Sequence, residues 1–265
     1  MSVYADLVRY RELFANLFRR DLQAKYRGSA LGVLWTIVNP IMLMGVYLLV
    51  FSVVLHSGFA KLPHYPLFLL SGLAIWTFFA AALQSATRSM LDNANLIRKI
   101  RFPRQLVPLS VVGAHLVSFA VMLVLLLVVN AIALPRARAT ELLAVPLAVL
   151  VLGLVSGLAL TLASLNVLFR DIEFIVAALL VPWFFLTPVI YPLTSGTIAA
   201  HKHIVAAIHW VNPLSPAVQA IRAPLFFGQM PFWGDALYLV VASAIALALG
   251  AYVFTRVDDQ IAIEV

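Results

Sequence analysis

The side chains of this 265-residue chain that could do chemistry are mostly cations, and none of them stands in a recognisable catalytic motif. The sequence contains no GxxxxGK[ST] phosphate-binding loop, no HExxH zinc motif, no GxSxG nucleophile motif and no catalytic pair of carboxylates. It also lacks cysteine, which excludes disulfides and thiolate metal sites. His201 and His203 have a weak metal spacing, although two solvated loop side chains are the commoner case. The sequence therefore predicts no enzyme, no metal site and no cofactor bound by this chain.

The composition indicates a membrane protein. Of the residues, 63% are hydrophobic and 11% are charged, and the mean hydropathy is +1.02. Soluble domains are about 45–50% apolar and about 25% charged. Several uncharged runs reach the roughly eighteen residues that a helix needs to cross the hydrocarbon of a bilayer. These runs are continuously apolar rather than alternating, which favours an all-α integral membrane protein over a β-barrel.

Six spans are predicted, over residues 31–55, 67–87, 106–134, 142–165, 174–191 and 236–254. With the N-terminus inside, most of the eighteen Lys and Arg residues fall in cytoplasmic segments, as the positive-inside rule requires. We therefore expect both termini in the cytoplasm and a bacterial inner membrane, with which the absence of cysteine is compatible. The same bias accounts for the net charge of +7, so no nucleic-acid partner is expected.

Two segments outside the spans have patterns of their own. Residues 1–30 form a cytoplasmic segment, in which 7–22 have apolar and charged faces at helical spacing, as in a helix lying at the membrane interface. A helix that binds a soluble partner is the alternative. Residues 192–235, within the membrane domain 31–265, are rich in proline and contain no run long enough to cross. Short re-entrant or interfacial helices are expected there, with a plain extracytoplasmic loop as the alternative.

The spans offer no obvious energy source. Ion-coupled transporters usually need carboxylates inside the membrane, whereas Asp92 and Asp235 lie at span edges, where solvation explains them. His115 falls inside the third span, where a helix–helix hydrogen bond is the commoner role. An ion-coupled transporter and an intramembrane enzyme are thus disfavoured. If the chain moves something uphill, a partner must supply the energy.

Several stretches together resemble one family. They are KYRGSALGVLWTIVNP (25–40), SGLAIWTFF (71–79), NANLIRKIRFPRQLVPL (93–109), LNVLFRDIEFIV with PWFFLTPVIYP (165–192), and NPLSP (212–216). In order and spacing they resemble the membrane subunit of bacterial polysaccharide ABC exporters, which export O-antigen, capsule or teichoic-acid chains. Each motif is weak alone, but the resemblance covers essentially the whole chain.

The resemblance implies a permease that works as a homodimer bound to two copies of a separate P-loop ATPase, which holds ATP and Mg²⁺. Lipid-linked glycans would move outward through a channel at the dimer centre, and residues 192–235 would form an outer gate. A permease of the same type for a small lipid or drug is the alternative.

The resemblance also assigns residues 88–104 as a cytoplasmic coupling segment that docks on the ATPase. Its candidate contact residues are Asp92, Asn93, Asn95, Leu96, Ile97, Arg98, Lys99 and Arg101. Leu96 and Ile97 would be apolar anchors, with Arg98 and Lys99 at the rim. A solvated positive-inside loop is the alternative. Arg170, Asp171 and Glu173 are candidates for a second, smaller contact, or form a plain charged turn.

Two further groups are candidates for substrate contact. Arg19, Arg20, Lys25 and Arg27 could guide an anionic lipid-diphosphate head group from the inner leaflet, or could only anchor the chain to membrane lipids. A glycan channel should present aromatic faces. The aromatic candidates are Trp35, Tyr47, Trp76, Phe79, Trp183, Phe184 and Tyr191. Any of them could instead fill a core or lie at the membrane interface.

Overall fold

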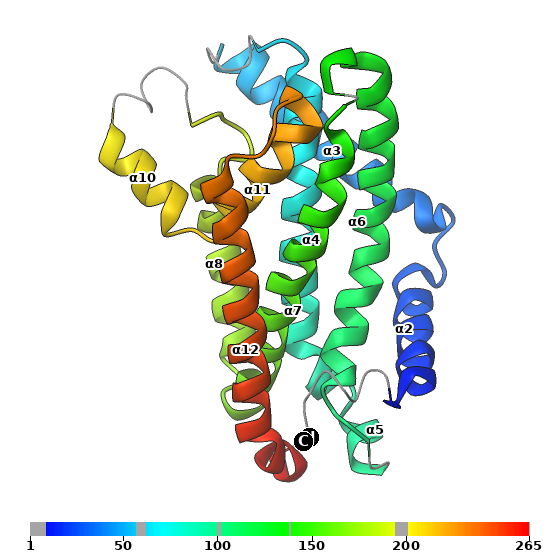
Figure 1. Ribbon diagram of the computed structural model, residues 1–265. Coiled ribbons are helices and arrows are strands. Elements are labelled where there is room, and N and C mark those ends of the chain that lie inside the picture. The colour runs from blue at the N-terminus through cyan, green and yellow to red at the C-terminus, as the bar shows by residue number, and fades with distance from the viewer. Residues whose placement is uncertain (1–8, 57–61, 100–101, 138, 194–200, 265) are drawn as a thin grey trace.

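The computed structural model describes residues 9–56, 62–99, 102–137, 139–193 and 201–264, and these residues form an all-helical bundle without strands (Figure 1). Five helical segments within them are long and apolar enough to cross a membrane. These are Gly32–Val54 (which contains α3, Trp35–Leu48), α4 (Tyr65–Asp92), α6 (Leu106–Ala133), Glu141–Leu168 (which contains α7, Ala144–Leu168), and the Trp233–Asp258 part of α12 (Trp233–Glu264). The predicted all-α membrane fold is confirmed.

The fifth predicted span is only partly helical. Helix α8 covers Ile172–Leu186, so the helix expected over 174–191 ends five residues early. Thr187 has φ −91° and ψ 134°, the extended conformation that a following proline imposes, and Pro188 follows it. The 15 residues of α8 span about 22 Å, which is less than the thickness of a bilayer core.

The proline-rich region contains two short helices. Helix α10 (Lys202–Trp210) has no buried residue, whereas α11 (Leu214–Arg222) is buried along most of its length. The α11 helix continues as the π-helical turn Ala223–Phe227, and the axis bends by 93° between α10 and this unit. Such a bend is typical of a broken span or a re-entrant loop. The burial of α11 favours a helix packed on protein, whereas the exposed α10 fits the alternative of an extracytoplasmic loop with a short surface helix.

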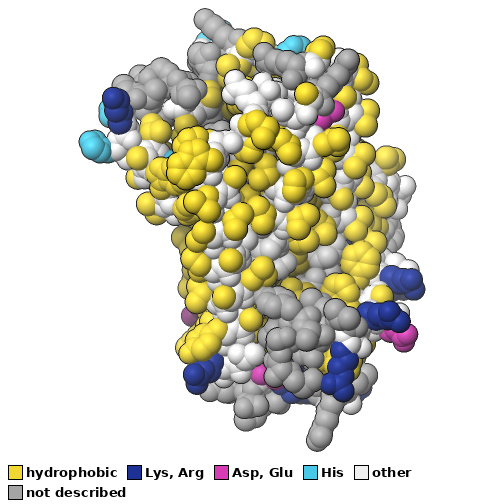
Figure 2. Space-filling view, in the orientation of Figure 1, with side chains coloured by type: hydrophobic (Ala, Val, Ile, Leu, Met, Phe, Trp, Pro, Cys, Tyr) yellow, Lys and Arg dark blue, Asp and Glu magenta, His cyan; other side chains and the backbone are white. Residues whose placement is uncertain are grey.

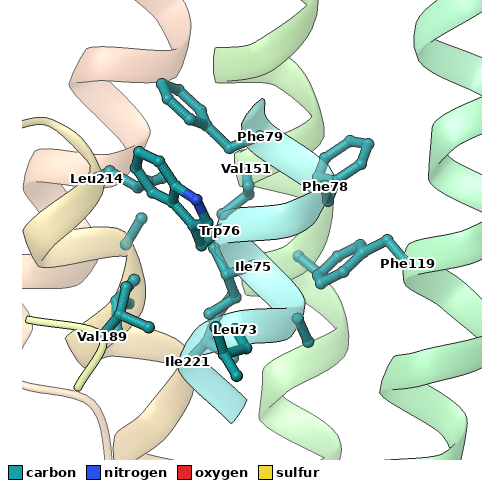
Figure 3. Packing of buried hydrophobic residues seen from close by; sticks show 14 of the residues in the cluster. Leu73, Ile75, Trp76, Phe78, Phe79, Phe119, Val151, Val189, Leu214 and Ile221 are labelled. Carbon is teal, nitrogen blue, oxygen red and sulfur yellow. The ribbon is translucent and has the colours of Figure 1, made fainter. Parts of the chain in front are cut away.

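Helix α4 lies at the centre of the main apolar core. In its apolar stretch 72% of the residues are buried, against 6% in Gly32–Val54. Figure 3 shows Trp76 of α4 on the side of Leu214, Leu73 on the side of Ile221, and Phe78 turned toward Phe119 of α6. The main core therefore joins α4 to the neighbouring spans and to α11.

A close helix crossing joins α7 and α12. A Cβ added at Gly157 of α7 would collide with the backbone of Ala246, and one at Gly250 of α12 would collide with the carbonyl of Gly157. Small residues allow such close approach in membrane helices, where van der Waals packing contributes much of the association energy. These two glycines thus hold α7 against α12.

A second core lies at the end of the bundle that carries α5 (Ala94–Lys99), and we call this end the α5 end (Figure 1). It is formed by apolar side chains from six helices: Leu17, Met90, Ile97, Leu106, Val107, Leu109, Leu160, Ala163, Val167, Phe254 and Val257. On the face seen in Figure 2, apolar side chains cover the middle of the molecule, while Lys and Arg gather toward the α5 end.

The N-terminal helix α2 (Arg11–Tyr26) is amphipathic as predicted, but part of its apolar side packs on protein. Leu17 is 4% exposed, and the ring of Phe18 lies against Gly113 of α6. Asp21 adds a polar contact, because its Oδ2 accepts a 2.6 Å hydrogen bond from Ser110 Oγ. Part of the apolar face expected at the membrane interface is therefore covered by α6. In Figure 1, α2 runs beside the lower part of α6.

Candidate functional site

The predicted coupling segment forms a short helix that is fixed by its apolar side. Asn93 begins α5 by accepting hydrogen bonds from the backbone N–H groups of Leu96 and Ile97, at 3.0 and 3.1 Å. Ile97 is 7% exposed inside the second core, so in this arrangement its own chain covers the side chain that was expected to contact the ATPase. Leu96 is half-buried against the same core. The exposed members of the candidate set are Asp92, Asn95, Arg98 and Lys99, and Arg101 lies outside the described residues.

The turn between α7 and α8 lies beside the end of α4. Arg88 Nε of α4 is 3.3 Å from Glu173 Oε2 and 3.8 Å from Asp92 Oδ1. Asn166 Oδ1 accepts a 3.0 Å hydrogen bond from the Glu173 backbone N–H. Glu173 therefore stabilises the turn within the chain, while Arg170 and Asp171 are exposed.

Five of the seven aromatic candidates pack against one another. Their ring-centroid distances are 5.4 Å for Tyr47–Phe184, 5.2 Å for Trp76–Phe184, 5.8 Å for Trp76–Phe79 and 5.1 Å for Phe79–Trp183. Trp76, Phe79 and Phe184 are buried in this core, which agrees with the alternative that they fill a core, and their contact with a channel stays a prediction. Mutual edge-to-face and stacked packing, rather than exposure, accounts for their positions.

The other aromatic candidates have different surroundings. The half-buried Trp183 donates a 2.8 Å hydrogen bond from Nε1 to Asn212 Oδ1, which joins α8 to the start of α11. Tyr191 donates from its hydroxyl to the carbonyl of Phe185 at 2.9 Å. Trp35 is 46% exposed and lies apart from the cluster, on the wall of a cavity.

This cavity has a volume of about 540 Å³ and lies between the end of α2, α3, α4 and α6. We call it the Lys25 cavity. Its polar lining residues are Lys25, Tyr26, Ser29, Thr36, Asn39, Thr77, His115 and Ser118, and its aromatic ones include Trp35, Phe78 and Phe119. Among the described residues, no three potential metal-ligating side chains lie together, here or elsewhere.

A chain of hydrogen bonds crosses the polar wall of the Lys25 cavity. Lys25 Nζ donates to Ser118 Oγ at 2.6 Å and lies 3.3 Å from His115 Nδ1. The Tyr26 hydroxyl is 3.0 Å from the same serine oxygen, and His115 Nε2 is 3.1 Å from Ser85 Oγ. Burial lowers the pKa of Lys25 to about 8. His115 thus makes the helix–helix hydrogen bond that the sequence favours, and it also contacts Lys25.

The four cations proposed to meet a lipid head group do not act together in this structure. Arg19, Arg20 and Arg27 are exposed, and Arg20 pairs with Asp21 at 2.7 Å. Of the four, Lys25 alone lines the Lys25 cavity.

Sequence reasoning missed a buried cation. Arg222, assigned to an outer loop, is 0% exposed in α11. It donates from Nη1 to the carbonyl of Pro188 at 2.8 Å and from Nη2 to that of Val189 at 3.0 Å. Its guanidinium also lies 3.7 Å from the Phe68 ring centroid, and Nε is 3.3 Å from Ser71 Oγ. Arg222 thus satisfies carbonyls that the early end of α8 leaves free, a role that no motif in the sequence indicates.

Asp235 also differs from the solvated edge residue expected. It is buried, and its Oδ1 lies 2.6 Å from His209 Nε2, a contact that joins α10 to the start of α12.

Comparison with known proteins assigns the family. The family model described as ABC-2 type transporter matches residues 12–226. The chain belongs to the ABC-2 type transporter family. It is therefore the membrane component of a transporter rather than an enzyme, and an ABC ATPase is its partner.

Curated relatives of this ABC-2 transporter cover nearly its whole length. The O-antigen export system permease protein RfbA of Myxococcus xanthus is 34% identical over 259 residues, which cover 97% of this chain and 96% of that protein. A protein of the same name from Klebsiella pneumoniae is 27% identical, with 95% and 94% covered. The polysialic acid transport protein KpsM of Escherichia coli is 24% identical, with 92% of each chain covered. The resemblance inferred from sequence motifs is confirmed.

Replacing Arg222 should destabilise this ABC-2 transporter. Arg222→Met keeps much of the side-chain volume but removes the donors to Pro188 and Val189, at a cost of about 1–3 kcal/mol for each orphaned buried carbonyl. We expect a clearly lower apparent Tm for the purified protein in detergent. Lys202→Met, on the exposed α10, is the matched control, and equal Tm values for the two variants would contradict the assigned role of Arg222.

Proposed function

We propose that this chain is the permease of an exporter that moves a lipid-linked polysaccharide, of O-antigen type, outward across the bacterial inner membrane. The observation that carries the proposal is the 34% identity to an O-antigen export permease over 97% of the chain. A relative named as a polysialic acid transport protein is 24% identical, so capsule is the second candidate cargo class. The energy comes from hydrolysis of Mg²⁺-bound ATP by a separate P-loop ATPase.

The α5 end supports the proposed coupling to that ATPase. Helix α5 presents Asn95, Arg98 and Lys99 outward, while Ile97 rests in the second core. A movement of the ATPase that displaces α5 would therefore also displace the ends of the long helices, through the packed side chains of the second core. Arg88 adds a polar connection from α4 to Glu173 at the start of α8. We propose Arg170 and Asp171 as the smaller second contact.

A homodimer with two ATPase copies completes the proposal. The apolar stretch of Gly32–Val54 is only 6% buried within one chain, so this span has a large apolar face for lipid or a second copy. The path for the glycan would run between the two copies, with α10 and α11 at its outer end. The visible gathering of Lys and Arg toward the α5 end supports placing that end, with both termini, in the cytoplasm (Figure 2).

Deleting the gene for this protein tests whether its cargo is a surface polysaccharide. In the host bacterium, deleting its gene should abolish surface polysaccharide and cause lipid-linked polysaccharide to accumulate inside, because synthesis continues without export. Antibody labelling of intact and permeabilised cells measures both pools, and the wild-type gene in trans should restore the surface signal. Normal surface polysaccharide in the deletion strain would contradict the proposal.

Reversing two charges on α5 tests the coupling site. The Arg98→Glu, Lys99→Glu double variant should fold, because Ile97 still holds α5 in the second core. Export should fall by roughly tenfold or more, the effect of losing about 1.4 kcal/mol of contact free energy. Surface polysaccharide and ATP hydrolysis by the purified complex are the measurements. The control is the Arg11→Glu, Arg256→Glu double variant, which changes the net charge by the same amount away from α5. Wild-type export by the Arg98→Glu, Lys99→Glu variant would contradict the assignment of α5 as the coupling site.

A further inference from the structure

The Lys25 cavity has the chemistry of an anion site. We propose that it binds the phosphate group of a lipid-linked substrate, with Lys25 Nζ as the cation and the hydroxyls of Ser118 and Tyr26 as additional donors. This inference rests on the proposed function for the nature of the lipid. It assigns substrate contact to Ser118 and Tyr26 and a positioning role to His115, which no sequence pattern indicated.

The charge balance of the cavity carries the inference. Among the described residues that line the cavity there is no carboxylate, so Lys25 has no counter-charge on its walls. Its hydrogen-bonding partners Ser118 and His115 carry no negative charge when the imidazole is neutral. Asp21, one turn earlier on α2, is occupied by Arg20 and Ser110. An ammonium that faces a cavity with no anion on its walls can gain a charge-assisted hydrogen bond from a bound phosphate.

The protonation of His115 follows from its neighbours. An ammonium can only donate hydrogen bonds, so the Lys25 contact makes Nδ1 of His115 the acceptor. The ring proton then lies on Nε2, which donates to Ser85 Oγ. Neutral His115 therefore orients Lys25 Nζ without adding a competing charge. His115 is a positioning residue, whereas Lys25 touches the ligand.

The remaining walls suit the rest of a lipid-linked sugar. Trp35, Phe78 and Phe119 offer apolar faces, and Asn39, Thr36 and Thr77 offer polar groups. The volume of about 540 Å³ falls in the range of small-molecule sites.

The test measures binding of farnesyl diphosphate to the purified permease–ATPase complex in detergent, with farnesol and inorganic diphosphate in parallel. The Lys25→Gln variant should weaken farnesyl diphosphate binding by about tenfold or more, while Lys25→Arg retains most of it. Arg11→Gln is the matched control, since it removes one charge from the same helix about 21 Å away and should bind as wild type does.

Three outcomes would overturn the inference. Wild-type affinity for farnesyl diphosphate in the Lys25→Gln variant would show that Lys25 does not contribute to binding. Equal competition by farnesol would show that the phosphate contributes nothing. Equal affinity for inorganic diphosphate would assign the cavity to a free anion rather than to a lipid head group. The His115→Gln variant should weaken binding less than Lys25→Gln, and a larger loss would overturn its role as a positioning residue.

The experiments distinguish a failure of the phosphate-site proposal from a failure of the polysaccharide-exporter proposal. If Lys25→Gln binds normally while gene deletion abolishes surface polysaccharide, the phosphate site is wrong and the exporter stands. If farnesyl diphosphate binding depends on Lys25 while deletion leaves surface polysaccharide unchanged, the phosphate site stands and the polysaccharide cargo is wrong.

Discussion

The second apolar core at the α5 end is the constraint on which the proposed mechanism depends. Leu17, Met90, Ile97, Leu106 and Phe254 belong to different helices, yet they bury one another at this end. Arg104 strengthens the arrangement, because its Nη1 donates to the backbone carbonyl of Asp258 at 2.6 Å and lies 3.0 Å from its carboxylate. A helix held in this way cannot move without moving the ends of its neighbours, which suits a contact for an energy-supplying partner.

Arg222 and Lys25 both contact the bundle but have different surroundings. Arg222 is fully buried and satisfied by two carbonyls and an aromatic face, so it stabilises the junction of α4, α8 and α11. Lys25 faces a cavity, and its partners are neutral. A fully satisfied cation contributes to structure, whereas one that lacks a counter-charge beside open volume is suited to binding a ligand.

The sequence predicts the spans well because the apolar runs are long, and only the fifth span differs, at Pro188. The early end of α8 could have been predicted from the sequence, because Pro188 disfavours a helical conformation at the preceding Thr187. The site was harder to predict. Periodicity cannot tell whether Phe79 faces a channel or other aromatic rings, nor that α2 covers α6. Contacts such as Arg88–Glu173 join residues far apart in the chain, and no local pattern encodes them.

The central claim is that energy for transport enters through a separate ATPase at the α5 end. Purification of the tagged chain from native membranes tests this most directly, with the copy numbers of all accompanying proteins measured. We predict a P-loop ATPase in equal copy number, and ATP-dependent transport by the reconstituted complex. A chain that purifies alone and still transports its cargo would contradict the account, because the energy source would then lie within its own spans.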